Sequence, residues 1–160
     1  MTNAHAGYPA AIWRQLCNDT PFAWHLRDQA SRSPAGRLAD LVASDLRLDA
    51  FLDALRIGVH AGQGQDAGLD IRDRGAAFAA VVVGHLAHRP EWIQQGLLAV
   101  AEDPARTDEL EQALRRLDPS VAVATARRYR VQAPAPPGTA TGAPPRPDPP
   151  TGRQRGPRPP

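Results

Sequence analysis

The chain has 160 residues, which suffices for one domain with an appendage and is too short for two ordinary domains. Apolar residues make up 42% of it and aromatic residues 5%, which is typical of helices packed through small aliphatic side chains. The single cysteine, Cys17, excludes an intramolecular disulfide and a cysteine-rich metal site, and it favours a reducing compartment.

Charge is divided unevenly along the chain, and all 19 basic residues are arginines. Residues 1–126 carry 12 arginines and 16 acidic residues, a balance of −4. Residues 127–160 carry 7 arginines against Asp148 alone, a balance of +6. An acidic body with a basic end indicates that the end contacts an anionic partner or folds back on its own domain.

The sequence shows neither a targeting segment nor a membrane segment. The first ten residues lack the basic and apolar parts of a signal peptide. The longest apolar run, 76–83, is far shorter than the roughly 20 residues that a membrane-spanning helix needs. We therefore expect a cytoplasmic protein with no membrane partner.

Prolines set the expected helix boundaries within a domain of residues 9–130, which follows a flexible segment at 1–8. The residue before a proline is disfavoured in the α conformation, so each X-Pro pair predicts a break between two helices. We expect Asp19 or Thr20 to cap the helix that Pro21 begins. The breaks fall at Pro21, Pro34, Pro90, Pro104 and Pro119.

Apolar periodicity predicts a further helix at residues 45–60. Leucine, phenylalanine and valine side chains recur there at i, i+3, i+4, i+7 and i+11, and Ser44 precedes them as a cap. The three glycines of 62–68 and the polar residues after them predict a surface loop.

The segment 76–88, AAFAAVVVGHLAH, is apolar in almost every direction and predicts a buried central helix. The fold expected from all these segments is all-α, with about six or seven short helices packed around 76–88. The alternative is an α+β fold in which residues 81–83 form a strand before Gly84, because runs of β-branched residues favour strands. That strand would have no evident partner.

Residues 131–160 hold 11 of the 17 prolines and present no apolar face. Such a segment cannot bury enough surface to offset the entropy lost on ordering, so we expect a disordered proline-rich tail. Its P-x-x-P spacings suit a linker or a polyproline II ligand.

Two histidines and the cysteine are weak candidates for chemistry. His85 and His88, three residues apart at the end of the central segment, could share a metal ion, but no spacing places a third ligand. Alternatively, both interact with the helix C-terminus, and His85 is partly buried and hydrogen-bonded. We interpret Cys17 as a small buried hydrophobic residue, since no nucleophile motif accompanies it. No catalytic residue, metal or cofactor is assigned.

Charged residues are the candidates for partner binding. Asp45, Asp49 and Asp53 stand four apart and form an acidic stripe on one helix face, which predicts either a solvated face or a docking face for a basic partner. Arginines at the basic end form the second candidate surface. They are Arg127, Arg128, Arg130, Arg146, Arg153, Arg155 and Arg158.

These observations favour a non-enzymatic protein-interaction module, an adaptor or regulatory domain with an acidic helical body and a basic proline-rich tail. The first alternative is a protein that binds nucleic acid through its C-terminal arginines, which would neutralise phosphates. The second is a small metal-binding protein or enzyme that uses His85 and His88.

Overall fold

The computed structural model describes residues 7–33, 35–64 and 68–132. Within these ranges the fold is all-α, as predicted, with six α-helices, one 3₁₀ helix and no strand. Residues 81–83 lie inside a helix, so the α+β alternative is wrong. The helices are α1 (Ala10–Arg32), α2 (Leu38–His60), α3 (Ala76–Leu86), α4 (Pro90–Glu102), the 3₁₀ helix η1 (Pro104–Arg106), α5 (Thr107–Arg116) and α6 (Pro119–Gln132).

The predicted flexible segment and disordered tail lie almost wholly outside the described residues. Residues 1–6 and 133–160 are outside the described residues, and so are four of the candidate arginines. Those four are Arg146, Arg153, Arg155 and Arg158.

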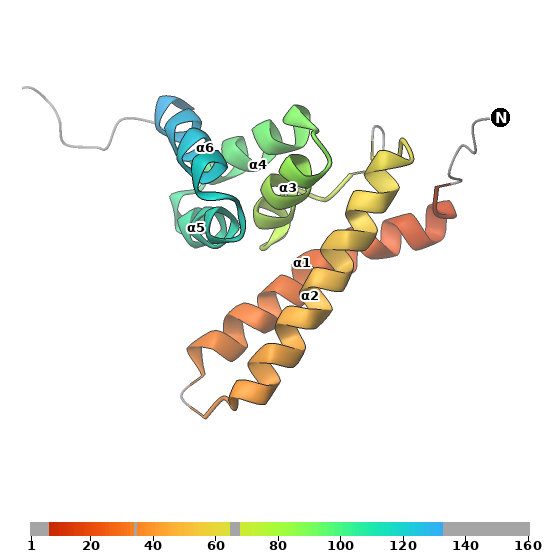
Figure 1. The fold of residues 1–160 in the computed structure, drawn as a ribbon, viewed down its shortest axis with the longest axis vertical. Coiled ribbons are helices and arrows are strands. Elements are labelled where there is room, and N and C mark those ends of the chain that lie inside the picture. Colours follow the sequence, from red (N-terminus) through yellow and green to blue (C-terminus); the bar gives the residue numbers. More distant parts are fainter. Residues whose placement is uncertain (1–6, 34, 65–67, 133–160) are drawn as a thin grey trace, which may run out of the picture.

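Helices α1 and α2 form a long antiparallel hairpin, and α3 to α6 gather on one part of it (Figure 1). The hairpin extends well past these four helices at the end where α1 turns into α2. Helix α3 contacts α1, α2, α4 and α5, and is therefore the element through which the hairpin and the C-terminal helices meet.

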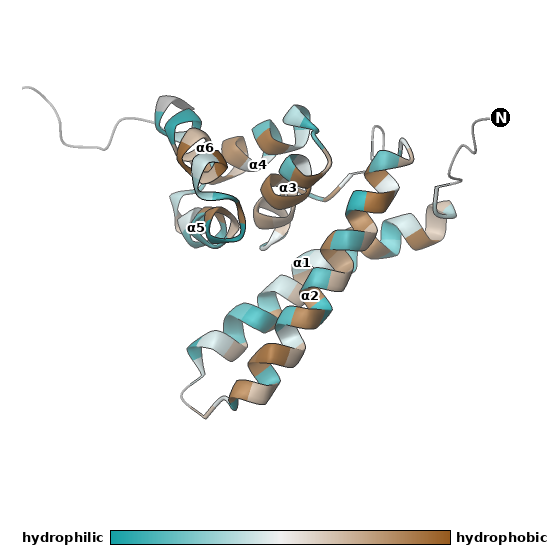
Figure 2. Ribbon diagram, in the orientation of Figure 1, coloured by the Kyte–Doolittle hydropathy of each residue, from teal (hydrophilic) through white to brown (hydrophobic). Residues whose placement is uncertain are grey.

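The prediction of a buried central helix is confirmed. Every residue of 76–84 is buried, and Figure 2 shows α3 as hydrophobic along most of its length. Helix α4 packs against it closely because Gly96 has no side chain: a Cβ there would lie 2.8 Å from Cγ2 of Val81 and 2.9 Å from the carbonyl oxygen of Ala77. His88, with a φ of 54°, ends the segment after the helix.

The predicted break at Pro21 is wrong, because α1 continues through it as one helix of 23 residues. A proline inside a helix costs about 3 kcal/mol. Packing on both sides of Pro21 offsets this cost: the ring centroid of Trp13 lies 6.4 Å from that of Trp92 in α4, and that of Trp24 lies 6.1 Å from that of Phe78 in α3. Both tryptophans are buried, so each half of α1 is anchored to the core.

The predicted start at Pro34 and the predicted cap at Ser44 are also wrong. Helix α2 begins at Leu38 and runs through Ser44, whose hydroxyl donates to the carbonyl oxygen of Asp40 within the helix. Residues 38–56 contain neither glycine nor proline, so nothing interrupts the hydrogen-bonded ladder. The hairpin therefore consists of two long helices in place of four short ones.

The three later prolines do begin helices, as predicted. Pro90 is the first residue of α4, Pro119 is the first residue of α6, and Pro104 opens η1 immediately before α5. The carboxylate of Asp103 caps η1 by accepting a hydrogen bond from the backbone N–H of Ala105.

The loop between α2 and α3 is tied to the core by a buried ion pair at the start of α5. The guanidinium of Arg106 donates to both carboxylate oxygens of Glu109, at 2.8 and 2.9 Å, and to the carbonyl oxygens of Ile71 and Asp73 in the loop. Glu109 also accepts from the backbone N–H of Ala77 at the start of α3. We call these residues the Arg106 clamp. The predicted loop is present, but its second half is held by hydrogen bonds from the buried Arg106.

The beginning of the same loop is fixed as well. The side-chain amide of Gln63 accepts a hydrogen bond from the backbone N–H of Tyr8 at 2.9 Å and donates to the carbonyl oxygen of Tyr8 at 2.8 Å.

Among residues 7–33, 35–64 and 68–132, no helix combines the length and the apolar character that crossing a bilayer requires.

Candidate functional site

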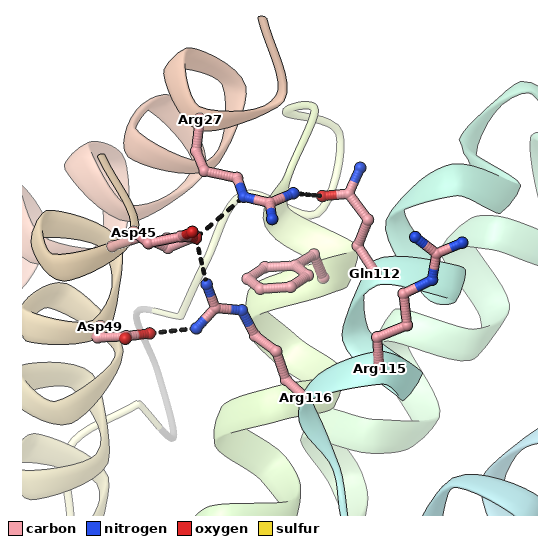
Figure 3. A pocket seen from close by; sticks show the side chains of 8 residues that line it. Arg27, Asp45, Asp49, Gln112, Arg115 and Arg116 are labelled. Atoms are coloured by element: carbon pink, nitrogen blue, oxygen red, sulfur yellow. Dashed lines mark hydrogen bonds and ion pairs between the residues drawn. The ribbon is translucent and has the colours of Figure 1, made fainter. Parts of the chain in front are cut away.

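A group of charged side chains surrounds a pocket of about 370 Å³ between the hairpin and α5. Phe78 of α3 lines this pocket. Charged side chains from α1, α2 and α5 surround it (Figure 3). Two residues of the predicted acidic stripe are part of its wall. The lining residues are Arg27, Asp45, Leu48, Asp49, Phe78, Gln112, Arg115 and Arg116.

Asp45 is the centre of the pocket's ion-pair network. Its Oδ1 accepts from Nε of Arg27 at 3.0 Å and from a guanidinium nitrogen of Arg116 at 2.9 Å. Arg116 pairs in addition with Asp49, and Arg27 donates to the amide oxygen of Gln112. The network therefore joins all three helices around one carboxylate.

The arginine at the end of α5 also lies over the ring of Phe78. The guanidinium carbon of Arg116 lies 5.7 Å from the ring centroid of Phe78, within the range of a cation–π interaction. Arg116 is only 25% exposed, so solvent screens its charge less than at a fully exposed site. Arg116 therefore holds the end of α5 against α3 through the Phe78 ring and against α2 through its ion pairs.

The structure separates the three aspartates of the acidic stripe. Asp45 and Asp49 face Arg116 and are engaged within the molecule. Asp53 is 66% exposed, and among the residues that the structure describes it pairs only with Arg56 on its own helix, at 3.2 Å. A basic partner would meet Asp53 directly but would have to displace Arg116 from the other two. The stripe is thus mostly an internal contact surface.

Sequence reasoning missed Arg27 and Arg116 as the partners of the stripe. Arg116 is 71 residues from Asp45 along the chain, so no local pattern connects them. The spacing of the aspartates every four residues predicted an acidic helix face. It did not predict which basic side chains would pair with that face.

His85 is held by a side chain of α6. Its Nε2 lies 2.8 Å from Oγ1 of Thr125, and that hydroxyl donates to the carbonyl oxygen of Val121. Because the hydroxyl proton is used there, we assign the proton of the neutral imidazole to Nε2, which donates to Thr125. Burial lowers the pKa of His85, and the positive charges of Arg128 and His88 lower it further. The prediction of a partly buried, hydrogen-bonded histidine is confirmed.

The lowered pKa of His85 predicts a loss of stability in mild acid. Below the ordinary histidine pKa of about 6.5, His85 takes up a proton in the unfolded chain, whereas the folded state resists this protonation. The free energy of unfolding therefore decreases as the pH decreases, until His85 is protonated in the folded state too. We expect the urea midpoint to fall between pH 7.5 and pH 5.5, and to fall less in His85→Gln. Arg128→Gln should be intermediate, because it removes one charge that opposes protonation.

The same urea titrations can contradict the prediction that His85 causes the loss of stability in mild acid. If the urea midpoint of His85→Gln falls with pH as steeply as that of the wild type, another group controls the acid sensitivity. The far-ultraviolet circular dichroism of each variant at pH 7.5 controls for a changed fold.

The structure does not bring His85 and His88 to a third ligand. In the described part of the chain, no three side chains of histidine, cysteine, aspartate or glutamate lie close enough together to hold a metal ion. Cys17, the other candidate for chemistry, is buried on α1. Burial raises its pKa to about 11, so it is a neutral thiol near pH 7 and a poor nucleophile.

The three arginines at the end of α6 differ from those of the pocket. Arg127, Arg128 and Arg130 are exposed, and none of them makes an ion pair with any residue that the structure describes. They lie where the negative end of the helix dipole favours cations. They therefore present positive charge that the domain itself leaves uncompensated.

Comparisons with known proteins give no relative for this chain: no family model, no curated protein and no solved structure matches it.

Proposed function

We propose that the protein is a non-enzymatic interaction module, an adaptor or regulatory domain whose basic end contacts an acidic protein surface. The observation that carries this proposal is the contrast between two sets of arginines. Arg27 and Arg116 are used within the fold, whereas Arg127, Arg128 and Arg130 are exposed and unpaired within the described residues. Like the rest of residues 127–160, these arginines favour an anionic partner.

The helical body serves as the scaffold of this module. Its pocket is lined by ion pairs that join the helices, its partly buried histidine is hydrogen-bonded, and its cysteine is buried. The free thiol of Cys17 suits a reducing compartment, and we propose a cytoplasmic location. Binding to nucleic acid is the second candidate function, because the same three exposed arginines could neutralise phosphates.

The test is affinity purification of the tagged full-length protein from its own cells, with quantitative mass spectrometry. We expect one or more proteins to be recovered with the wild type and at least about tenfold less with the triple variant Arg127→Glu, Arg128→Glu, Arg130→Glu, since like charges across an interface cost several kcal/mol. The matched control is Arg14→Glu, Arg37→Glu, Arg72→Glu, which changes the net charge equally at exposed positions elsewhere.

Two outcomes would contradict the protein-binding proposal. The first is equal recovery of every protein by the wild type and the α6 triple variant. The second is recovery that nuclease treatment abolishes, accompanied by direct binding to a 20-base-pair DNA or RNA duplex that weakens steeply with salt. That second outcome would establish the nucleic-acid function instead.

A further inference from the structure

Three side chains that carry or take up positive charge come together where the end of α3 lies against α6. Nε2 of His85, in the last turn of α3, lies 2.8 Å from Oγ1 of Thr125 in α6. Arg128 follows Thr125 by three residues, so the two share one face of α6, with their Cβ atoms about 5–6 Å apart. His88 follows His85 by three residues and lies just after the end of α3. We call His85, His88 and Arg128 the basic cluster.

The basic cluster resists taking up a further proton. Burial lowers the pKa of His85 most, and the positive charges of Arg128 and His88 lower it further. Among the described residues, every charge that shifts this pKa is positive. His88 and Arg128 are exposed, so a group from outside the domain can reach them.

The acidic side chains around this end of α3 are engaged elsewhere. Glu91 at the start of α4 pairs with Arg89 at 2.7 Å. Asp118 at the start of α6 accepts hydrogen bonds from the backbone N–H and the hydroxyl of Ser120. Charged groups of α2 and α5 line a separate pocket against α3 and pair with one another or with Arg56. They are Asp49, Asp53 and Arg116.

Backbone carbonyl groups at the end of α3 are used as well. The carbonyl oxygens of Val83, Gly84 and His85 accept from the backbone N–H groups of the three residues after Leu86. An anion from outside the domain is therefore the group that would balance the basic cluster.

The hydrogen bond of His85 leaves one ring nitrogen for a second proton. Nε2 keeps its proton in the bond to Thr125, and Nδ1 forms no hydrogen bond with any residue that the structure describes. Uptake of a proton at Nδ1 therefore adds a charge and breaks no bond. His88 is the second group of the cluster that gains charge in mild acid.

We propose that the basic cluster is a proton-linked site for a carboxylate of the acidic partner, which binds there more tightly as the pH falls. A carboxylate beside Arg128 and His88 offsets the two charges that oppose protonation of His85, so its binding favours uptake of the proton. Binding linkage is reciprocal, so uptake of the proton strengthens binding of the carboxylate by the same factor. This inference rests on the proposed function, because Arg128 belongs to the surface assigned there.

The probe for the test is a rhodamine-labelled peptide of about ten glutamates, whose carboxylates represent an acidic protein surface. Fluorescence anisotropy with the full-length protein gives its dissociation constant at pH 6.0 and pH 8.0, at constant ionic strength. The ordinary pKa of glutamate is about 4.3, so the peptide keeps its charge at both pH values. We expect binding at least about fivefold tighter at pH 6.0, because a charge within about 4–6 Å changes a protonation equilibrium by roughly tenfold or more, and solvent at a half-exposed site reduces this effect.

A double variant removes the two titrating groups of the cluster. In His85→Gln with His88→Gln, the amide at position 85 retains a donor for Thr125 but takes up no proton. Its dissociation constants at the two pH values should therefore agree within about twofold. The matched control is His25→Gln with His60→Gln, which removes two histidines of the hairpin and should keep the pH dependence of the wild type.

Two single variants locate the site on α6. Arg128→Gln should raise the dissociation constant at least about threefold at both pH values, since it removes a permanent charge of the cluster. Arg14→Gln removes an exposed arginine from α1 and should bind as the wild type does. Circular dichroism of every variant at both pH values checks that the helices are intact.

The proton linkage is overturned if the wild type binds the peptide equally well at the two pH values, or if the variant without His85 and His88 keeps the wild-type dependence. Either result leaves the proposed function standing, provided that affinity purification still recovers proteins that the α6 triple variant loses. The site itself is overturned if the peptide binds at neither pH. If a DNA duplex shows the histidine-dependent pH effect and the peptide does not, the assignment of a carboxylate is overturned in favour of phosphate.

Discussion

Replacing Arg106 by methionine is expected to lower the free energy of unfolding by about 3–5 kcal/mol, the usual cost of removing one partner of a buried ion pair. Glu109 is fully buried, and without Arg106 its carboxylate retains, among the described residues, only the backbone N–H of Ala77. The carbonyl oxygens of Ile71 and Asp73 each lose the guanidinium donor as well, although that of Asp73 keeps the backbone N–H of Ala76. Urea unfolding followed by circular dichroism at 222 nm measures the change.

Two further variants separate the buried charge from its hydrogen bonds. In Arg106→Met with Glu109→Leu no charge is left buried at this site, so this double variant should be more stable than Arg106→Met alone. Arg56→Met removes the same kind of side chain from an exposed pair with Asp53 and should cost about 1 kcal/mol or less. If Arg106→Met is no more destabilising than Arg56→Met, the Arg106 clamp does not hold the fold.

Replacing Gly75 by alanine is expected to cost roughly 2–5 kcal/mol, for two independent reasons. Gly75 has a φ of 89°, a left-handed conformation that costs other residues about 1–2 kcal/mol. A Cβ there would also lie 2.8 Å from the carbonyl oxygen of Pro21 and 2.8 Å from the Trp24 ring, and relieving such crowding costs about 1–3 kcal/mol.

Gly62 supplies the matched control for Gly75. Its φ is 88°, but nothing lies within 4 Å of the position of its Cβ. Gly62→Ala should therefore show the backbone cost alone, and the difference between the two variants measures the close approach of α1 to the start of α3. Equal midpoints for the two variants in urea would show that α1 moves aside without cost.

The contrast between Pro21 and the later prolines shows how far the sequence could predict the fold. Residues 76–88 predicted a buried helix correctly because an apolar surface on all sides has no other place in a small domain. Pro90 and Pro119 start helices where local preference and tertiary packing agree. At Pro21 local preference and tertiary packing conflict, and the packing of Trp13 against α4 and of Trp24 against α3 keeps the helix continuous. Rules based on the local sequence do not include such contacts.

The candidate surfaces follow the same division. The aspartates of α2 were recognisable as one face from their spacing alone. Their engagement by Arg116 was not, because it depends on how α5 crosses the hairpin. The i, i+3 spacing of Arg106 and Glu109 is as ordinary as that of many exposed pairs, and only the folded structure shows that this one is buried.

The position of α5 has a consequence for the order in which the chain folds. Its contacts with the hairpin close long loops: Arg27 and Gln112 are 85 residues apart, and Asp45 and Arg116 are 71 apart, whereas Arg27 and Asp45 within the hairpin are separated by only 18. The entropy lost on closing a loop grows with its length, so the hairpin can form early and α5 joins it late. The ion pairs of Arg116 with Asp45 and Asp49 then form late in folding, so they slow unfolding more than they speed folding.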